Sequence, residues 1–235
     1  VVHFLVSEKS VMRLTLKNMH LKKDVIKMIA GLGISPFIMQ STESLVTITL
    51  NTGLQRYGGD LYVGSMSILM SVMQMITIPV QGITQGIQPI ISYNYGAGNK
   101  KRLKAILAFS YKFECAMGAV LALILCVFAK PLILMFMNQE SIVNAGVPML
   151  RLQLAGAVFT AVTLVSTCTF QSAGKALNAF LLSVSRQGVI FAVVIFILSK
   201  TVGYYGVLSA QPVSDFLTAV LAVILVRRSV YREIR

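Results

Sequence analysis

Residues 204–226 read YYGVLSAQPVSDFLTAVLAVILV, a run in which Asp215 is the only charged side chain. An α-helix rises about 1.5 Å per residue, so about 20 apolar residues are enough to cross the hydrocarbon core of a bilayer. Lipid offers backbone amides no hydrogen-bond partners, and a helix satisfies these groups internally. The stretch therefore predicts a transmembrane helix.

Comparable apolar stretches recur along the rest of the chain, at roughly 27–50, 62–91, 106–128, 147–170 and 177–199. Hydrophobic residues make up 56% of the 235 residues and charged residues only 12%, whereas soluble domains carry about a quarter charged residues. Little chain is left for a soluble domain. We therefore predict an all-α integral membrane protein with six transmembrane helices.

The positive charge of the chain is distributed unevenly. With 21 Lys and Arg against 8 Asp and Glu, the formal net charge is +13. If six spans alternate in direction, most cations fall on one side, in the N-terminal segment, two loops and the C-terminus. The opposite loops hold only Arg56, Lys130, Arg151 and Lys200. This positive-inside pattern places both termini in the cytoplasm of a cell-membrane protein and argues against a nucleic-acid partner.

The ends of the chain predict a division into three parts. Residues 1–6 are apolar and charge follows them, so residues 1–26 are interpreted as the end of a preceding helix plus a basic cytoplasmic connector. Residues 27–226 are interpreted as the transmembrane lobe and residues 227–235 as a basic cytoplasmic tail. The sequence has no initiator Met and no signal-peptide pattern at its start, so we interpret the chain as a fragment.

Residue types that support catalysis or metal binding are scarce within the spans. The two histidines, His3 and His20, lie on the N-terminal basic segment, and the three cysteines fall inside apolar spans without metal-site or disulfide spacing. We therefore expect no enzyme activity, no metal site and no cofactor other than a coupling ion, either a proton or sodium.

The second span is longer than a bilayer requires, so we expect it to tilt, kink or project into the cytosol. Pro79, Gly82, Gly86 and Pro89 are the places where we expect a bend. Before this span, the sequence at 57–60 predicts a tight turn, because its two glycines allow backbone angles that other residues avoid.

Polar side chains recur with helical spacing inside four of the apolar spans. Polar groups at bilayer depth are costly and usually face a bundle interior or a wet cavity. In the first span Gln40, Glu43, Thr47 and Asn51 follow Pro36 on one helical face. The other lines are Ser67, Ser71, Gln74, Gln81, Gln85 and Gln88 in the second span, Thr160, Thr163, Thr167 and Gln171 in the fourth, and Gln211, Asp215 and Thr218 in the sixth.

Two explanations compete for these polar stripes. Such side chains often join membrane helices through hydrogen bonds worth roughly 0.6 kcal/mol each. They also line substrate pathways, which are typically surrounded by broken helices. Because proline lies near three of the four stripes, we predict a central polar cavity. The candidate cation- and substrate-binding residues are Glu43, Gln40, Thr47, Asn51, Gln74, Gln81 and Asp215.

Ionisable side chains within the spans are stronger indications of function than the neutral polar side chains. Glu43 shares its helix face with no cation, and burial favours the protonated form of a carboxyl, so this group is suited to carry a proton or to hold a cation. Asp215 and Arg186 lie near the middle of the sixth and fifth spans, where they form either a structural ion pair or part of the transport site. Glu114 and Lys112 lie in the inner part of the third span.

The most distinctive stretch of the sequence is GITQGIQPIISYNYGAGN at 82–99. It strongly resembles the segment that ends the second helix of a lobe in the multidrug and toxic-compound extrusion (MATE) family. Pro36 with Glu43 resembles that family's seventh helix, residues 170–175 with Arg186 its tenth and eleventh, and residues 211–215 its twelfth.

This resemblance implies twelve helices in two six-helix lobes, with this chain as the C-terminal lobe and substrates bound between the two. It also implies export driven by the inward flow of protons or sodium ions. In the sodium-coupled branch an acidic residue of the tenth helix joins that of the seventh. The matching region here, about Thr160 to Thr163, has no acid, so the chain departs from that branch.

We therefore predict the C-terminal half of a cation-coupled antiporter that exports amphipathic organic cations and drugs. Its partners would be an N-terminal lobe of the same protein and the lipid bilayer. A carboxylate among neutral polar stripes suits a cation with apolar bulk. The alternative is a related lipid-linked saccharide flippase, which a basic stripe facing the cavity would favour. Arg186 is the only arginine in the middle of a span, so the sequence favours drug export.

Overall fold

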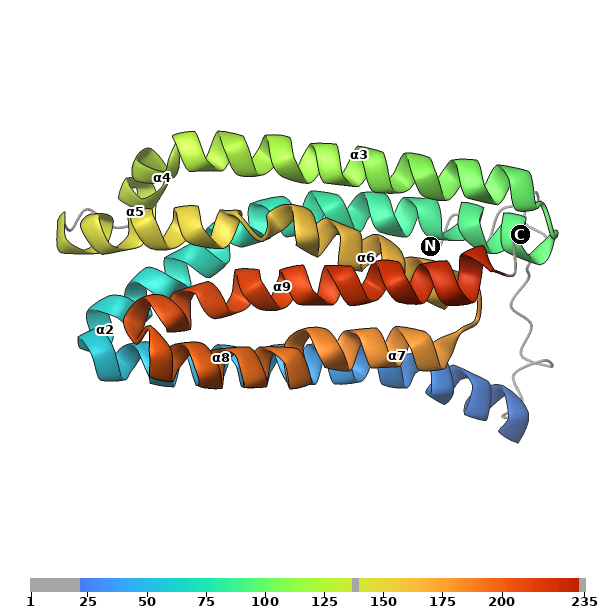
Figure 1. Ribbon diagram of the computed structural model, residues 1–235, viewed down its shortest axis with the longest axis horizontal. Helices are drawn as coiled ribbons and strands as arrows, with labels where there is room; N and C mark the ends of the chain where they lie inside the picture. The colour runs from blue at the N-terminus through green and yellow to red at the C-terminus, as the bar shows by residue number, and fades with distance from the viewer. Residues whose placement is uncertain (1–21, 137–139, 233–235) are drawn as a thin grey trace, which may run out of the picture.

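The computed structural model describes residues 22–136 and 140–232, and every element in these two ranges is a helix. In chain order the elements are α2 (Lys23–Gly96), α3 (Lys100–Val127), α4 (Ala129–Phe136), α5 (Glu140–Leu154), α6 (Ala157–Ser172), α7 (Ala176–Val184), the π-helical turn η2 (Ser185–Val189), α8 (Ile190–Thr201), α9 (Tyr204–Val226) and the π-helical turn η3 (Arg227–Tyr231). Figure 1 shows the long helices packed along one common axis. The predictions for residues 1–21 and 233–235 lie outside the described residues.

The element α2 consists of two helices that meet at Gly59. This residue has φ 61° and ψ −151°, a backbone conformation that favours glycine because it has no Cβ. The chain reverses direction there, and the second half of α2 runs back along the bundle (Figure 1). The turn expected at 57–60 is therefore a break within α2, flanked on both sides by helix.

Two further crossings of the bundle are irregular. The pair α5 and α6 is bent by 43° at Ala155 and Gly156. The element α7 continues into α8 through η2. Neither irregularity contains a proline, whereas Pro148 and Pro212 lie inside helices.

The second half of α2 shows no break at the prolines and glycines where we expected a bend. Gly59 is the one residue within α2 whose backbone leaves the helical region. Residues Val63–Gly96 form one helix of 34 residues, roughly 50 Å long and longer than the hydrocarbon core of a bilayer. The second half of α2 is therefore longer than one crossing requires, as the sequence predicts.

Three helices in the described chain are long and apolar enough to cross a membrane, namely Val63–Gly96, Lys100–Val127 and Tyr204–Tyr231. The bent pair Ile142–Leu154 and Ala157–Ser172 adds a fourth crossing if it is counted as one span. The prediction of an all-α integral membrane fold is confirmed. The count of six spans stays a prediction, because the first half of α2 and the segment from α7 to α8 are not among these helices.

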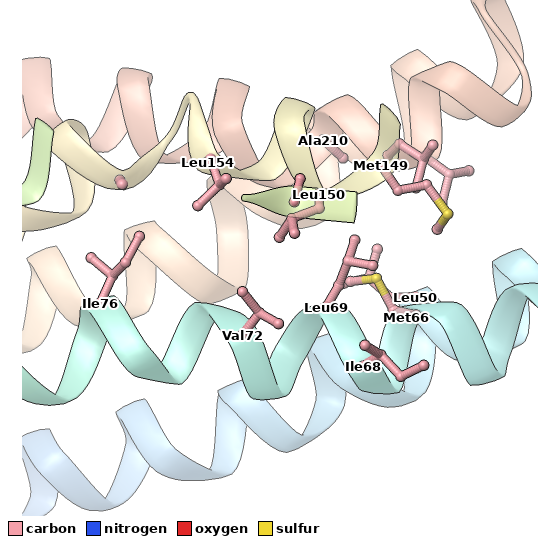
Figure 2. Packing of buried hydrophobic residues seen from close by; sticks show 14 of the residues in the cluster. Leu50, Met66, Ile68, Leu69, Val72, Ile76, Met149, Leu150, Leu154 and Ala210 are labelled. Carbon is pink, nitrogen blue, oxygen red and sulfur yellow. The ribbon is translucent and has the colours of Figure 1, made fainter. Parts of the chain in front are cut away.

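The element α6 lies at the centre of the packing. Every residue from 165 to 170 is buried, and α6 contacts α2, α3, α7 and α9. Next to it, a hydrophobic core cluster joins α2 to α5, where Val72 and Ile76 face Leu150 and Leu154 (Figure 2). Burial of these apolar surfaces against one another holds the irregular crossings in place.

The ends of α2, α6 and α9 lie together at one end of the bundle (Figure 1). Lys175, which precedes α7, donates from Nζ to the backbone oxygen of Ser229 in η3. A second core cluster brings Ile91 of α2 next to Val226 of α9. The 171–176 loop, the end of α2 and η3, which the sequence assigns to one side of the membrane, are therefore close in space.

Candidate functional site

The first half of α2 carries the acid that we expected to bind a cation. Gln40 Nε2 donates a hydrogen bond to Glu43 Oε2 at 3.2 Å, and Thr47 Oγ1 donates to the backbone oxygen of Glu43 at 2.9 Å. Glu43, Thr47 and Asn51 are half-buried, whereas Gln40 is exposed. Within residues 22–136 and 140–232, no cation pairs with Glu43. The carboxylate is thus supported on its own helix and remains accessible.

The second half of α2 points its polar stripe away from the packed core. Gln74 is exposed and Gln81 is half-buried, while Val72, Ile76 and Val80 are buried on the other side of the helix. No hydrogen bond between described residues joins Gln74 or Gln81 to the Glu43 stripe. Both stripes therefore face away from the packed core, and the structure does not bring them together into one closed site.

A groove lies on the opposite side of the first half of α2. It has a volume of about 900 Å³ and runs between residues 42–56 of α2 and residues 188–199 of η2 and α8. Its walls are mainly apolar, with Leu45 and Phe191 among them, and Arg56 lines it as well. None of the candidate binding residues expected from the sequence lines this groove.

Asp215 lies in a buried polar cluster rather than in an open cavity. Arg186 Nε lies 3.0 Å from Asp215 Oδ1, and Thr160 Oγ1 donates to Asp215 Oδ2 at 3.1 Å. Gln211 Nε2 lies 3.5 Å from Asp215 Oδ1, and Arg186 Nη2 lies 3.4 Å from Thr160 Oγ1. Asp215 is thus held by η2, α6 and its own helix α9.

Local backbone irregularities bring this cluster together. The turn η2 interrupts the α-helical hydrogen-bond ladder, and the backbone oxygen of Arg186 accepts a hydrogen bond from Ser214 Oγ at 2.9 Å. Where α5 passes into α6, Gly156 comes close to α9, since a Cβ there would lie 3.2 Å from Pro212 Cα and 3.5 Å from Asp215 Oδ2. Thr160, one turn after Gly156, then reaches the carboxylate.

Of the two interpretations that the sequence left open for Asp215 and Arg186, this geometry favours the structural ion pair. The guanidinium neutralises the carboxylate, and hydroxyl and amide groups occupy the remaining acceptor positions. A cation would have to displace Arg186 in order to bind there. Glu43 is therefore the stronger candidate for a group that receives a cation.

Glu114 is a buried acid that our set of candidate residues did not include. It lies near the middle of the 28-residue α3 and is fully buried (0% exposed). Thr84 of α2 contacts both of its carboxyl oxygens, at 2.9 and 2.8 Å. An acid within an apolar span was the available signal, but the partner is 30 positions away and becomes adjacent only through the packing of α2 on α3.

No group of three or more His, Cys, Asp or Glu side chains that could hold a metal ion occurs among the described residues. Cys115, Cys126 and Cys168 are free thiols.

The sequence profile of the MatE family matches residues 36–207, which is more than half of the chain. The chain belongs to the MatE family. The matched region contains the Glu43 stripe, the stretch at 82–99, Glu114 and Arg186, whereas Asp215 lies just beyond it. The resemblance expected from the sequence is therefore confirmed.

Multidrug export protein MepA of Staphylococcus aureus (strain NCTC 8325 / PS 47) is 25% identical to this MatE chain over 209 residues, which cover 87% of the chain and 45% of MepA. A solved structure of the MATE multidrug transporter DinF-BH is 30% identical, with a TM-score of 0.84, and the match covers 99% of this chain and 52% of that one. The crystal structure of MATE in complex with MaL6 has a TM-score of 0.90 at 17% identity and covers 99% and 53%. The chain spans about half the length of these relatives.

Proposed function

We propose that this chain forms one lobe of a cation-coupled antiporter that exports amphipathic organic cations across the cytoplasmic membrane. Membership of the MatE family supports transport as the class of function. The names of two relatives, a multidrug export protein and a multidrug transporter, support drug-like substrates. The coupling ion in this proposal is a proton or sodium.

The observation that carries the proposal is the setting of Glu43. Its carboxylate is half-buried, has Gln40 as a neutral partner, and pairs with no cation within the described chain. A carboxylate of this kind attracts a cation, and the attraction disappears when the group binds a proton. A proton and a cationic drug would then compete for the same carboxylate, so that entry of the proton releases the drug.

The outward polar stripes are the second support. Glu43 and Asn51 on the first half of α2, and Gln74 and Gln81 on the second half, are half-buried or exposed although they lie in apolar helices. Polar groups at bilayer depth are costly unless water or protein covers them. We propose that they face a wet cavity shared with a second lobe of the complete transporter.

The alternative function, a lipid-linked saccharide flippase, needs a free cation in the cavity to receive a phosphate group. Arg186 is the candidate cation near the middle of a span, and it is paired with Asp215 at 3.0 Å. A paired and mostly buried guanidinium presents little positive charge to a substrate. This pairing favours a cationic substrate over a phosphorylated one.

The test uses the complete transporter that contains this chain, purified and reconstituted into lipid vesicles. Transport of a cationic dye is followed under an imposed proton gradient, an imposed sodium gradient and no gradient. The proposal expects one of the two gradients to drive dye movement against its own concentration gradient. Equal dye movement under all three conditions, or movement of a lipid-linked saccharide in place of the dye, would contradict it.

A further inference from the structure

Glu114 is enclosed by three helices. It projects from α3, its hydroxyl partner Thr84 belongs to α2, and Cys168 of α6 donates from Sγ to the backbone oxygen of Thr84 at 3.4 Å. Glu114 has 0% and Thr84 7% of its surface exposed. A carboxyl in this position has no contact with water while the three helices are packed in this way.

The hydrogen bonds around Thr84 can accommodate a protonated Glu114. Thr84 Oγ1 lies 2.8 Å from the backbone oxygen of Val80, 2.9 Å from Glu114 Oε1 and 2.8 Å from Glu114 Oε2. A hydroxyl has one hydrogen to donate. If that hydrogen goes to Val80, the contact with Glu114 is a hydrogen bond only when the acid carries a proton and donates it to Thr84.

The groups that face Glu114 do not neutralise a negative charge. Thr84 is the hydrogen-bond partner from α2, and the nearest titratable group of α6 is the thiol of Cys168. On α3 itself the neighbouring titratable groups are the thiol of Cys115, the exposed amine of Lys112 and the hydroxyl of Tyr111, which is bonded to Ser166. No ion pair joins Lys112 to Glu114 in the described structure. The cations of α4 and α5, Lys130 and Arg151, are exposed, and neither pairs with Glu114 in the described structure. An ionised Glu114 would be a buried charge with one hydrogen bond, which is a costly arrangement.

We propose that Glu114 is a proton-binding site of this chain, filled while α2, α3 and α6 are packed together and emptied when their separation lets water reach the carboxyl. The site deepens the antiport proposed above, because it names a proton as a coupling ion and gives it a position apart from Glu43. The proton moves from the Glu114 carboxyl to water and leaves a carboxylate. The same packing that excludes water thus favours proton binding.

Infrared difference spectra of the complete transporter in lipid test the filled state of the site. Subtracting the spectrum of Glu114→Gln from that of the wild type isolates the bands of Glu114. The proposal expects the C=O band of a protonated carboxyl at neutral pH, where an exposed glutamate is ionised. Carboxylate bands in the difference spectrum would overturn it. Glu140→Gln, which alters an exposed acid at the start of α5, is the matched control and leaves the protonated-carboxyl band in place.

A second variant covers the case in which Glu114→Gln does not fold. Thr84→Val keeps the shape of the side chain and removes the hydroxyl, so the protonated-carboxyl band of the wild type shifts to higher frequency. An unchanged spectrum would mean that no protonated Glu114 is bonded to Thr84 and would overturn the proposal. Adding sodium at constant pH is expected to leave the band unchanged, and its conversion into carboxylate bands would assign the site to sodium instead.

Transport separates this proposal from the function on which it rests. In reconstituted vesicles, Glu114→Gln is expected to bind the cationic dye as the wild type does and to lose the response of efflux to a proton gradient. If Glu114→Gln keeps the wild-type response to the proton gradient, the role of Glu114 is contradicted but the antiport function is not. A wild-type protein whose dye transport ignores proton and sodium gradients would contradict the antiport function, whatever the spectra show.

Discussion

Arg186 Nε lies 3.0 Å from Asp215 Oδ1, and this contact joins η2 to α9 beside the bend between α5 and α6. The two side chains are 12% and 6% exposed, so the pair is largely removed from water. A buried ion pair tolerates the loss of one partner poorly, because the other charge stays behind. The pair therefore fixes η2 against α9, which contains Pro212 near this point. Thr160 of α6 donates to the same carboxylate and ties the third helix to the pair.

A single replacement in this pair is expected to destabilise the protein far more than replacement of both residues. Asp215→Asn leaves Arg186 without a counter-charge and lowers the free energy of unfolding by about 3–5 kcal/mol. The double variant with Arg186→Met and Asp215→Leu removes both charges and regains most of that loss, because apolar groups can replace a buried pair. The melting temperature of the purified complete transporter in detergent measures both effects.

The double variant also separates a structural pair from a binding site. With Arg186 and Asp215 both replaced, we expect export of cationic dye with unchanged ion dependence. A folded double variant that has lost this dependence would show that Asp215 belongs to the cation-binding residues after all.

The apolar composition predicted the helices well, because a helix in lipid is specified by local sequence. The positions at which the helices bend or become π-helical were harder to predict. Prolines within helices pointed to bends, but the 43° bend lies at Ala155 and Gly156, and the π-helical turn contains Gly188. The position of the bend depends on tertiary packing, because Gly156 approaches Pro212 of α9. Only the packed structure shows which helix comes close to which glycine.

The same distinction applies to the candidate site. Gln40 and Glu43 are three positions apart, so their hydrogen bond follows from helical spacing. Thr84 and Glu114 are 30 positions apart, and Arg186 and Asp215 are 29 apart. Their contacts depend on how the helices pack, which residue spacing in a single sequence does not reveal.

Gly206, near the start of α9, is expected to tolerate no side chain. A Cβ at this position would collide with the backbone carbonyl of Leu198 in α8, which cannot rotate away as a side chain can. Gly206→Ala is expected to lower the free energy of unfolding by about 3 kcal/mol. Thermal unfolding of the complete transporter measures the change.

Gly82→Ala is the matched control for this substitution, because Gly82 is also helical and a Cβ there would meet nothing within 4 Å. It is expected to be neutral or to stabilise by up to ~1 kcal/mol, since alanine favours a helix more than glycine does. Equal melting temperatures for the two variants would show that α8 and α9 are not packed so closely.

The distribution of charge predicts the orientation of the lobe. In a complete transporter whose Cys115, Cys126 and Cys168 are replaced by alanine, a cysteine at exposed Asn144 is expected to react with an impermeant reagent in intact cells. A cysteine at exposed Lys101, in the basic cluster at the start of α3, is expected to react only after permeabilisation. External labelling of a cysteine at position 101 in intact cells would show that the orientation is the reverse of the predicted one.

Glu43→Gln in the complete transporter tests whether Glu43 receives the coupling ion. Glutamine keeps the size and hydrogen bonding of the side chain but does not titrate. The measurement is the rate of cationic-dye efflux as a function of the proton or sodium gradient, with Glu140→Gln as the control for loss of an exposed acid. We expect Glu43→Gln to be expressed normally and its efflux to lose the response to the gradient, while Glu140→Gln behaves as the wild type. Efflux by Glu43→Gln at the wild-type rate and with the wild-type ion dependence would show that Glu43 does not receive the coupling ion.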